Sequence, residues 1–259
     1  MDAFVPVGAD RIWVDDSGGE GVPFVLLHPG ITDSRVWDPM LPHLGSHRVL
    51  RFDRRGFGRS PRATEPYSAL GDLTAVLDAL GVDRAHLVGN SMGGETALAL
   101  AVTAPERVAS LTLLCPGING YPWGEGDEDA ELEAAWEKAK ADQDVSAMAA
   151  VQGRAWFRSG SDDYLDEQVL AATTLDHESE GLEQDNPEQW SRVDQIRVPT
   201  TVVAADLDPA DSLQASLDLA ERIPGATLVR LPVDHVPQYR EPGAVAEVVL
   251  ATADRAGTA

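Results

Sequence analysis

The chain has 259 residues, of which 43% are hydrophobic, and its formal net charge is −23. The hydrophobic content is sufficient for one large core domain, and the acidic charge disfavours nucleic acid and anionic membranes as partners. The single cysteine excludes an intrachain disulfide, and no apolar run reaches the roughly 18 residues of a membrane span. The N-terminus lacks the pattern of a signal peptide. We therefore expect a soluble, cytoplasmic monomer or homodimer that acts on a small molecule.

Short apolar segments alternate with segments of helical periodicity along the chain. The first 16 residues predict a small antiparallel hairpin at the edge of a sheet. Further strands are predicted over residues 24–28, 48–53, 84–89, 108–115, 200–205 and 226–232. Apolar residues at helical spacing occupy 67–81 and 91–108. Strands that alternate with helices in this way predict βαβ units and a mostly parallel sheet that is covered on both faces.

The alternation stops after Pro116 and resumes at Val198. Residues 119–195 between these points are helical in pattern, acidic and rich in large aromatic side chains. An insertion of this length between two core strands predicts a helical cap over the loop side of the sheet. Residues 1–118 and 196–259 then form the core domain. The alternative is an ordinary helical excursion that packs on a face of the sheet.

A serine flanked by glycines stands between a predicted strand and a predicted helix. Gly89, Ser91 and Gly93 in "GNSMGG" fit the pattern G-x-S-x-G in the strand–turn–helix context that this motif requires. A turn this tight leaves no room for side chains two residues before and after the serine. It also places the serine hydroxyl at the N-terminus of a helix, where a developing negative charge is favoured. We expect Ser91 to be a nucleophile.

A nucleophilic serine needs a base, and the base needs an acid that orients it. His235 follows the last predicted strand and is the candidate base. The acid is expected in "ADLDPAD", after the strand over 200–205. Asp208 is preferred because one helix and one strand separate it from His235 and return the chain beside it. Asp206 is the alternative.

Two backbone amides are expected to form the oxyanion hole. One belongs to Met92, directly after the serine, and the other to Gly30, in the loop after the strand over 24–28. His28, in the same loop, is interpreted as holding the shape of the loop. The side chains expected to contact the substrate are Ile31, Trp123, Trp156, Phe157 and Val236.

The stretches "LLHPGITDSRVW", "RFDRRGFGRSP", "LVGNSMGGETALALA", "VVAADLDP" and "DHVPQYREPGAVAEVVL" together resemble the α/β-hydrolase fold superfamily. The resemblance covers nearly the whole chain except the predicted cap. It implies an α/β fold with a mostly parallel eight-stranded sheet, flanked by helices and carrying a helical cap insertion. It also implies a Ser91–Asp208–His235 triad, in the chain order of that family.

The resemblance further implies that Asp53 and Arg54 are structural. Two positions depart from the family pattern. Pro29 replaces the usual glycine after His28 and stiffens the loop. Ala205 replaces the usual glycine before the acid loop, which leaves the choice between Asp206 and Asp208 open.

The expected activity is hydrolysis of a carboxylic ester or lactone of a small, partly apolar substrate through an acyl-enzyme. One alternative is C–C bond hydrolysis of the meta-cleavage type, which "GNSMGG" also resembles, and another is a proline-type aminopeptidase. A third alternative, of a different class, is a receptor-like binding protein with little turnover. Because the sequence holds no metal-ligand cluster, Walker-type loop or dinucleotide fingerprint, we expect no cofactor and no metal.

Overall fold

The computed structural model describes residues 2–124, 130–178 and 181–257. Its centre is one eight-stranded sheet in the order β1-β2-β4-β3-β5-β6-β7-β8. The strands are β1 (Asp2–Val7), β2 (Asp10–Asp16), β3 (Phe24–Leu27), β4 (Val49–Phe52), β5 (Ala85–Asn90), β6 (Val108–Leu114), β7 (Thr200–Ala205) and β8 (Thr227–Leu231). The β1–β2 and β2–β4 pairs are antiparallel, and every other neighbouring pair is parallel. The expected eight-stranded, mostly parallel sheet and its edge hairpin are confirmed.

Several of the inner strands are buried along their whole length. Every residue of β3, β6 and β7 is buried, whereas β8 lies at the edge and is largely exposed. A parallel strand covered on both faces reads as a continuous apolar run, which is why these strands were recognisable in the sequence.

Helices cover both faces of the sheet. The helices are α1 (Ala69–Ala79), α2 (Met92–Thr103), α3 (Ala130–Ala141), α4 (Val145–Trp156), α5 (Asp163–Glu178), α6 (Ala210–Arg222), α7 (Pro237–Arg240) and α8 (Pro242–Ala256). Apolar side chains of α1, α2 and α6 join one buried cluster, and those of α8 join a second. Successive strand residues such as Leu87 and Val88 belong to opposite clusters, because side chains alternate across a strand. The sheet is therefore a central layer between two helical layers.

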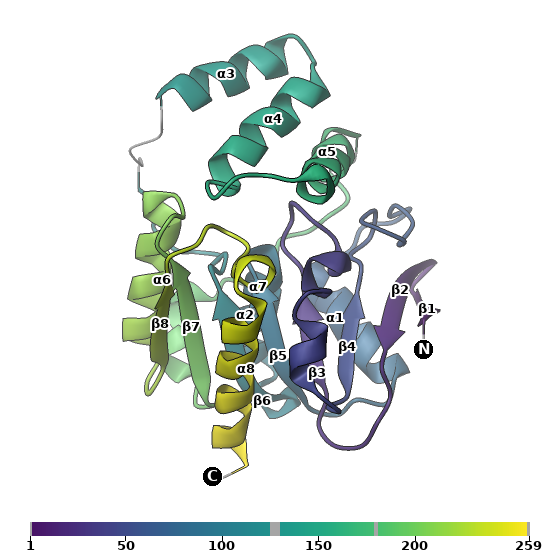
Figure 1. The fold of residues 1–259 in the computed structure, drawn as a ribbon. Coiled ribbons are helices and arrows are strands. Elements are labelled where there is room, and N and C mark those ends of the chain that lie inside the picture. The colour runs from purple at the N-terminus through teal and green to yellow at the C-terminus, as the bar shows by residue number, and fades with distance from the viewer. Residues whose placement is uncertain (1, 125–129, 179–180, 258–259) are drawn as a thin grey trace.

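Helices α3, α4 and α5 form a separate layer over one end of the sheet (Figure 1). They lie over the end at which the parallel strands finish. Ala149 and Phe157 from the α4 region and Leu165 and Val169 from α5 pack within the cluster that also contains α8. The helical layer is thus joined to the core by continuous apolar packing. The predicted cap also includes residues 125–129 and 179–180, which lie outside the described part of the chain.

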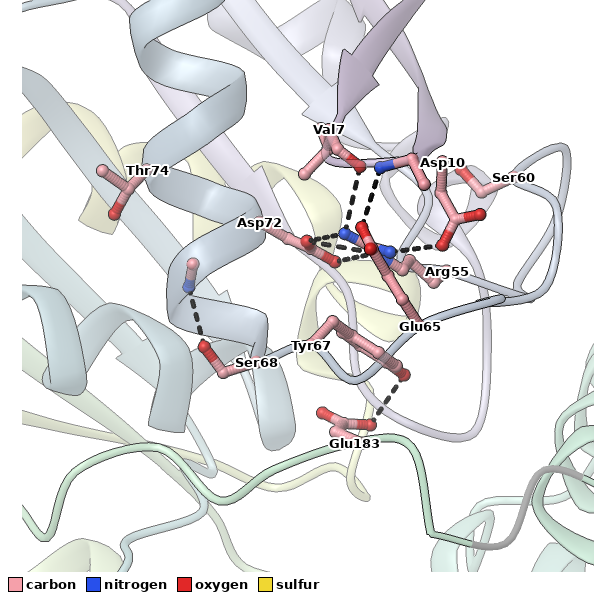
Figure 2. Close-up of polar contacts among 12 residues, drawn as sticks. Val7, Asp10, Arg55, Ser60, Glu65, Tyr67, Ser68, Asp72, Thr74 and Glu183 are labelled. Carbon is pink, nitrogen blue, oxygen red and sulfur yellow. Dashed lines mark hydrogen bonds and ion pairs between the residues drawn. The ribbon is translucent and has the colours of Figure 1, made fainter.

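The loop between β4 and α1 is held by a buried ion-pair network. The Arg55 guanidinium donates two hydrogen bonds to one Asp72 oxygen and a third to the other, at 2.8–3.1 Å, and also pairs with Asp10. It donates a further hydrogen bond to the Val7 carbonyl, so that one side chain links β1, β2 and α1 (Figure 2). Truncating one partner would leave an uncompensated buried charge, which typically costs about 3–5 kcal/mol.

Candidate active site

Ser91 occupies a strained turn between β5 and α2. Its φ is 52° and its ψ is −118°, a conformation that residues with a side chain rarely adopt and that costs about 1–3 kcal/mol. Three backbone hydrogen bonds hold it there. The Ser91 amide donates to the Leu114 carbonyl at 3.0 Å, and the Ser91 carbonyl accepts from the amides of Glu95 and Gly117 at 3.0 and 2.9 Å. The strain is therefore maintained by β6 and by the first turn of α2.

The two flanking glycines are required by close backbone approach. A Cβ on Gly89 would lie 2.4 Å from the Gly93 carbonyl oxygen. A Cβ on Gly93 would lie 2.1 Å from the carbonyl oxygen of Leu27 in β3. Because these neighbours are backbone atoms, the clash has no simple relief. This geometry agrees with the tight-turn argument for expecting glycine at both positions.

His235 and Asp208 form a buried pair. The Nδ1 atom of His235 lies 2.8 and 3.0 Å from the two carboxylate oxygens of Asp208, and the two residues are 3% and 5% exposed. A carboxylate only accepts, so Nδ1 carries the proton and donates it to this bond. Asp206, in contrast, is exposed and accepts a hydrogen bond from Arg230 at 2.7 Å. Of the two candidate acids, Asp208 is the one that faces His235.

A buried amide network connects the serine turn to the histidine loop. The Asn90 side-chain amide donates to the carbonyl oxygens of Leu114 and His235 at 2.9 and 3.0 Å. Its own oxygen accepts from the Gln238 amide at 2.9 Å, and both amide residues are fully buried. Asn90 thus holds the loop after β8 beside the end of β5. Sequence reasoning overlooked both amides, although a polar asparagine at the end of an apolar strand was a usable signal.

Two cavities meet at Ser91 and His235. The first is about 710 Å³ and is also lined by Gly30, Ile31 and Met92. The second is about 630 Å³ and includes Trp123, which is 47% exposed. Trp136 and Trp156 line both cavities. The side chains predicted for the nucleophile and the base therefore lie on the wall shared by both cavities.

The predicted substrate-contacting residues divide into two groups. Ile31, Trp123 and Trp156 line the cavities. The Trp156 ring contacts the His235 ring in a tilted arrangement, with 4.3 Å between the ring centroids and 41° between the ring planes. Phe157 and Val236 line neither cavity and are buried in the cluster that contains α8. The physical reason is that consecutive residues point in different directions. The side chain of Trp156, the last residue of α4, lies on the cavity wall, whereas the side chain of Phe157 packs with residues of α5.

The loop after β3 is held by a neutral histidine. Nδ1 of His28 donates to the Pro29 carbonyl at 2.8 Å, and Nε2 accepts from the Arg54 amide at 3.0 Å. Complete burial lowers the pKa of His28, which favours the uncharged ring that this arrangement requires. Both ring nitrogens form hydrogen bonds with backbone groups, in agreement with the interpretation that His28 holds the shape of the loop. A Cβ on Gly30 would meet the Met92 Sδ atom at 2.1 Å, so the two residues predicted for the oxyanion hole are adjacent.

Cys115 lies beside the His235–Asp208 pair. It directly follows β6 in a left-handed conformation with φ of 43°, and its amide donates to the Val203 carbonyl at 2.9 Å. Burial, together with the charge of Asp208, raises the pKa of the Cys115 thiol well above its usual value. Sequence reasoning considered this cysteine only for disulfides, because nothing in the linear sequence connects it to the other two residues.

The comparison with known families agrees with this architecture. Residues 23–242 match the family model described as the alpha/beta hydrolase fold. The chain belongs to the α/β-hydrolase family. Within the residues that the structure describes, no helix combines the length and the apolar character needed to cross a membrane.

Relatives of this chain are named for different substrates. It is 40% identical to the 2-hydroxymuconate semialdehyde hydrolase of Pseudomonas sp. strain CF600 over 134 residues, which cover 49% of the chain and 45% of that relative. It is 29% identical to the rhodomycin D methylesterase DauP of Streptomyces sp. strain C5, over 85% of the chain and 87% of that protein. The structure of Est816, described as an N-acyl homoserine lactone degrading enzyme, matches with a TM-score of 0.77 and 30% identity, over 96% of this chain and 99% of that one.

Proposed function

We propose that this hydrolase cleaves a carboxylic ester or lactone of a small, partly apolar substrate through an acyl-enzyme on Ser91. The observation that carries the proposal is the buried His235–Asp208 pair beside a strained serine on the wall of the two cavities. The methylesterase and the lactone-degrading enzyme among its relatives support the same bond class.

In the proposed reaction, the Ser91 hydroxyl attacks the substrate carbonyl and His235 accepts its proton. Asp208 holds the ring in the tautomer with the proton on Nδ1 and stabilises the imidazolium that forms. His235 then returns the proton to the leaving alkoxide, and an acyl ester remains on Ser91. A water molecule that His235 deprotonates releases the acid and restores the serine.

The tetrahedral intermediates carry a negative oxygen that needs preorganised donors. The backbone amides of Met92 and Gly30 are proposed for this role, with the positive end of α2 adding to the local potential. Removing one such donor from a serine hydrolase typically costs about 10²–10³ in kcat.

Helices α3–α5 are proposed to act as a cap that selects the substrate. Trp136 of α3 and Trp156 of α4 line both cavities, so these helices supply much of the apolar wall that the ends of the strands lack. A cavity of this kind buries the acyl compound and excludes bulk water.

The test combines covalent labelling with turnover. A fluorophosphonate should add one mass increment to the peptide that contains Ser91, and the protein should hydrolyse a short-chain p-nitrophenyl ester. Ser91→Ala should lose both signals, whereas Ser212→Ala, a serine on the wall of the second cavity, should keep both. Labelling at another residue would refute Ser91 as the nucleophile. A labelled protein without turnover on a panel of esters and lactones would favour a receptor-like role.

A second candidate is C–C bond hydrolysis of a meta-cleavage product. Its specific support is the 40% identity with 2-hydroxymuconate semialdehyde hydrolase over a stretch of 134 residues. Turnover of 2-hydroxymuconate semialdehyde with a higher kcat/KM than any ester of the panel would replace the ester proposal with this one.

A further inference from the structure

Three potential metal ligands converge at the ends of neighbouring strands. Cys115 follows β6, Asp208 follows β7 and His235 follows β8, and these strands are adjacent and parallel. The Cys115 Sγ, a carboxylate oxygen of Asp208 and a ring nitrogen of His235 all lie within 4.8 Å of one another. All three residues are buried, and Cys115 is only 2% exposed. The cluster is therefore a compact donor set of sulfur, nitrogen and oxygen.

We propose that Cys115, Asp208 and His235 bind a divalent cation of the Zn²⁺ or Cd²⁺ type, and that the bound ion inhibits the hydrolase. Thiolate and imidazole select such borderline or soft ions, whereas Mg²⁺ and Ca²⁺ prefer sites made of oxygen alone. Only the inhibition rests on the proposed function, because binding of the ion does not depend on which bond the enzyme cleaves.

The distances are close to those of a tetrahedral site. With Zn–S of about 2.3 Å and Zn–N and Zn–O of about 2.0–2.2 Å, ligand atoms stand about 3.3–3.6 Å apart. The Nδ1 atom of His235 and the nearer Asp208 oxygen, now 2.8 Å apart, must separate by roughly half an ångström. The sulfur must approach by at most about 1.5 Å.

The second cavity provides the route for the ion. Cys115 and His235 line it, and Glu133 and Asp211 lie on the same wall. The net charge of −23 raises the local concentration of cations near the protein. A water molecule from the cavity can complete the fourth position, which is common where three protein groups hold zinc.

Binding exchanges one proton for the metal. The ion displaces the proton of the Cys115 thiol, which passes to the solvent. The Nδ1 proton of His235 moves to Nε2, so that neutral imidazole binds the ion through Nδ1 and Nε2 has no free lone pair for the Ser91 proton. The Asp208 carboxylate exchanges its hydrogen bond with His235 for a bond to the metal. The imidazole is then held by the ion and cannot carry the charge that it must develop when it accepts the Ser91 proton.

The test measures metal binding and inhibition separately. Calorimetric titration of the metal-stripped protein with Zn²⁺ should give one site whose Kd agrees with the inhibition constant for ester hydrolysis, and a chelator should restore the rate. Cys115→Ser should raise both constants at least about tenfold, since even outer-shell changes cost 10–100-fold. Inhibition is expressed relative to the uninhibited rate of each variant. Asp211→Asn removes a carboxylate from the same cavity and should change neither constant by more than about twofold.

Several results would overturn the proposal. Equal Zn²⁺ affinity in Cys115→Ser and wild type, or equal inhibition by Mg²⁺, would assign the effect to surface carboxylates.

Ser91→Ala should bind Zn²⁺ as wild type does, so metal binding can be measured even if the protein hydrolyses no ester. If Cys115→Ser does not fold, Co²⁺ added to wild type gives the answer. A thiolate-to-cobalt charge-transfer band supports the site, and its absence refutes it.

Discussion

Replacement of Asp208 by asparagine should nearly abolish turnover while leaving the fold intact. The Asp208 carboxylate is buried and its nearer oxygen lies 2.8 Å from Nδ1 of His235. At an effective dielectric constant of about 20, a unit charge pair at this distance is worth about 6 kcal/mol, which the imidazolium of the transition state would lose. At about 1.4 kcal/mol per tenfold, this corresponds to roughly four powers of ten in kcat. An asparagine amide would also donate to Nδ1 and favour the wrong tautomer.

The matched control is Asp206→Asn, two residues away on the same loop. The Asp206 side chain is 35% exposed and pairs with an exposed Arg230, so its loss should change the free energy of unfolding and the activation free energy by less than about 0.5 kcal/mol. The assay is steady-state hydrolysis of a p-nitrophenyl ester, with circular dichroism to confirm folding of both variants. A loss of less than tenfold for Asp208→Asn, or a larger loss for Asp206→Asn, would refute the reasoning.

Three further predictions concern buried groups. Arg55→Met should lower the free energy of unfolding in urea by about 3–5 kcal/mol, and adding Asp72→Leu should recover part of this loss; an unchanged stability would contradict the role of the ion-pair network. Phe157→Ala should lower the free energy of unfolding by about 3–5 kcal/mol and leave the kcat/KM ratio of long to short acyl esters unchanged. Trp156→Ala should shift that ratio. The reverse result would exchange the roles of the two residues. The stability advantage of wild type over His28→Gln should be complete above about pH 6.5 and shrink by up to about 1.4 kcal/mol per pH unit below it. The reason is that His28 binds a proton in the unfolded chain at these pH values, whereas burial disfavours its protonation in the folded chain. Denaturation at pH 7.5 and 5.5 measures the difference in stability, and a difference that does not depend on pH would contradict the prediction.

Periodicity and turn chemistry in the sequence were sufficient to predict the layered fold. The strands over 200–205 and 108–115 were recognisable because a buried parallel strand is apolar on both faces. The serine turn was recognisable because Gly89 and Gly93 stand where any Cβ would meet backbone. These features are local, and neighbouring residues in the chain carry the whole signal.

Only the tertiary structure decided which side chains meet. Asp206 and Asp208 are two residues apart on one loop, yet only Asp208 faces His235. Asp206 lies beside the end of β8 and bonds Arg230, whereas the loop after β8 brings His235 to Asp208. The same holds for Trp156 and Phe157, whose directions depend on how the end of α4 packs against α5.

Cys115 lies far from Asp208 and His235 in the chain, and its position beside them follows from the adjacency of β6, β7 and β8. The bond from Asn90 to the His235 carbonyl likewise joins residues separated by 145 positions. Sequence patterns reflect the local requirements of a strand or turn, such as burial on both faces or the absence of a Cβ. Contacts between the ends of different strands depend on strand order and register, which no local pattern contains.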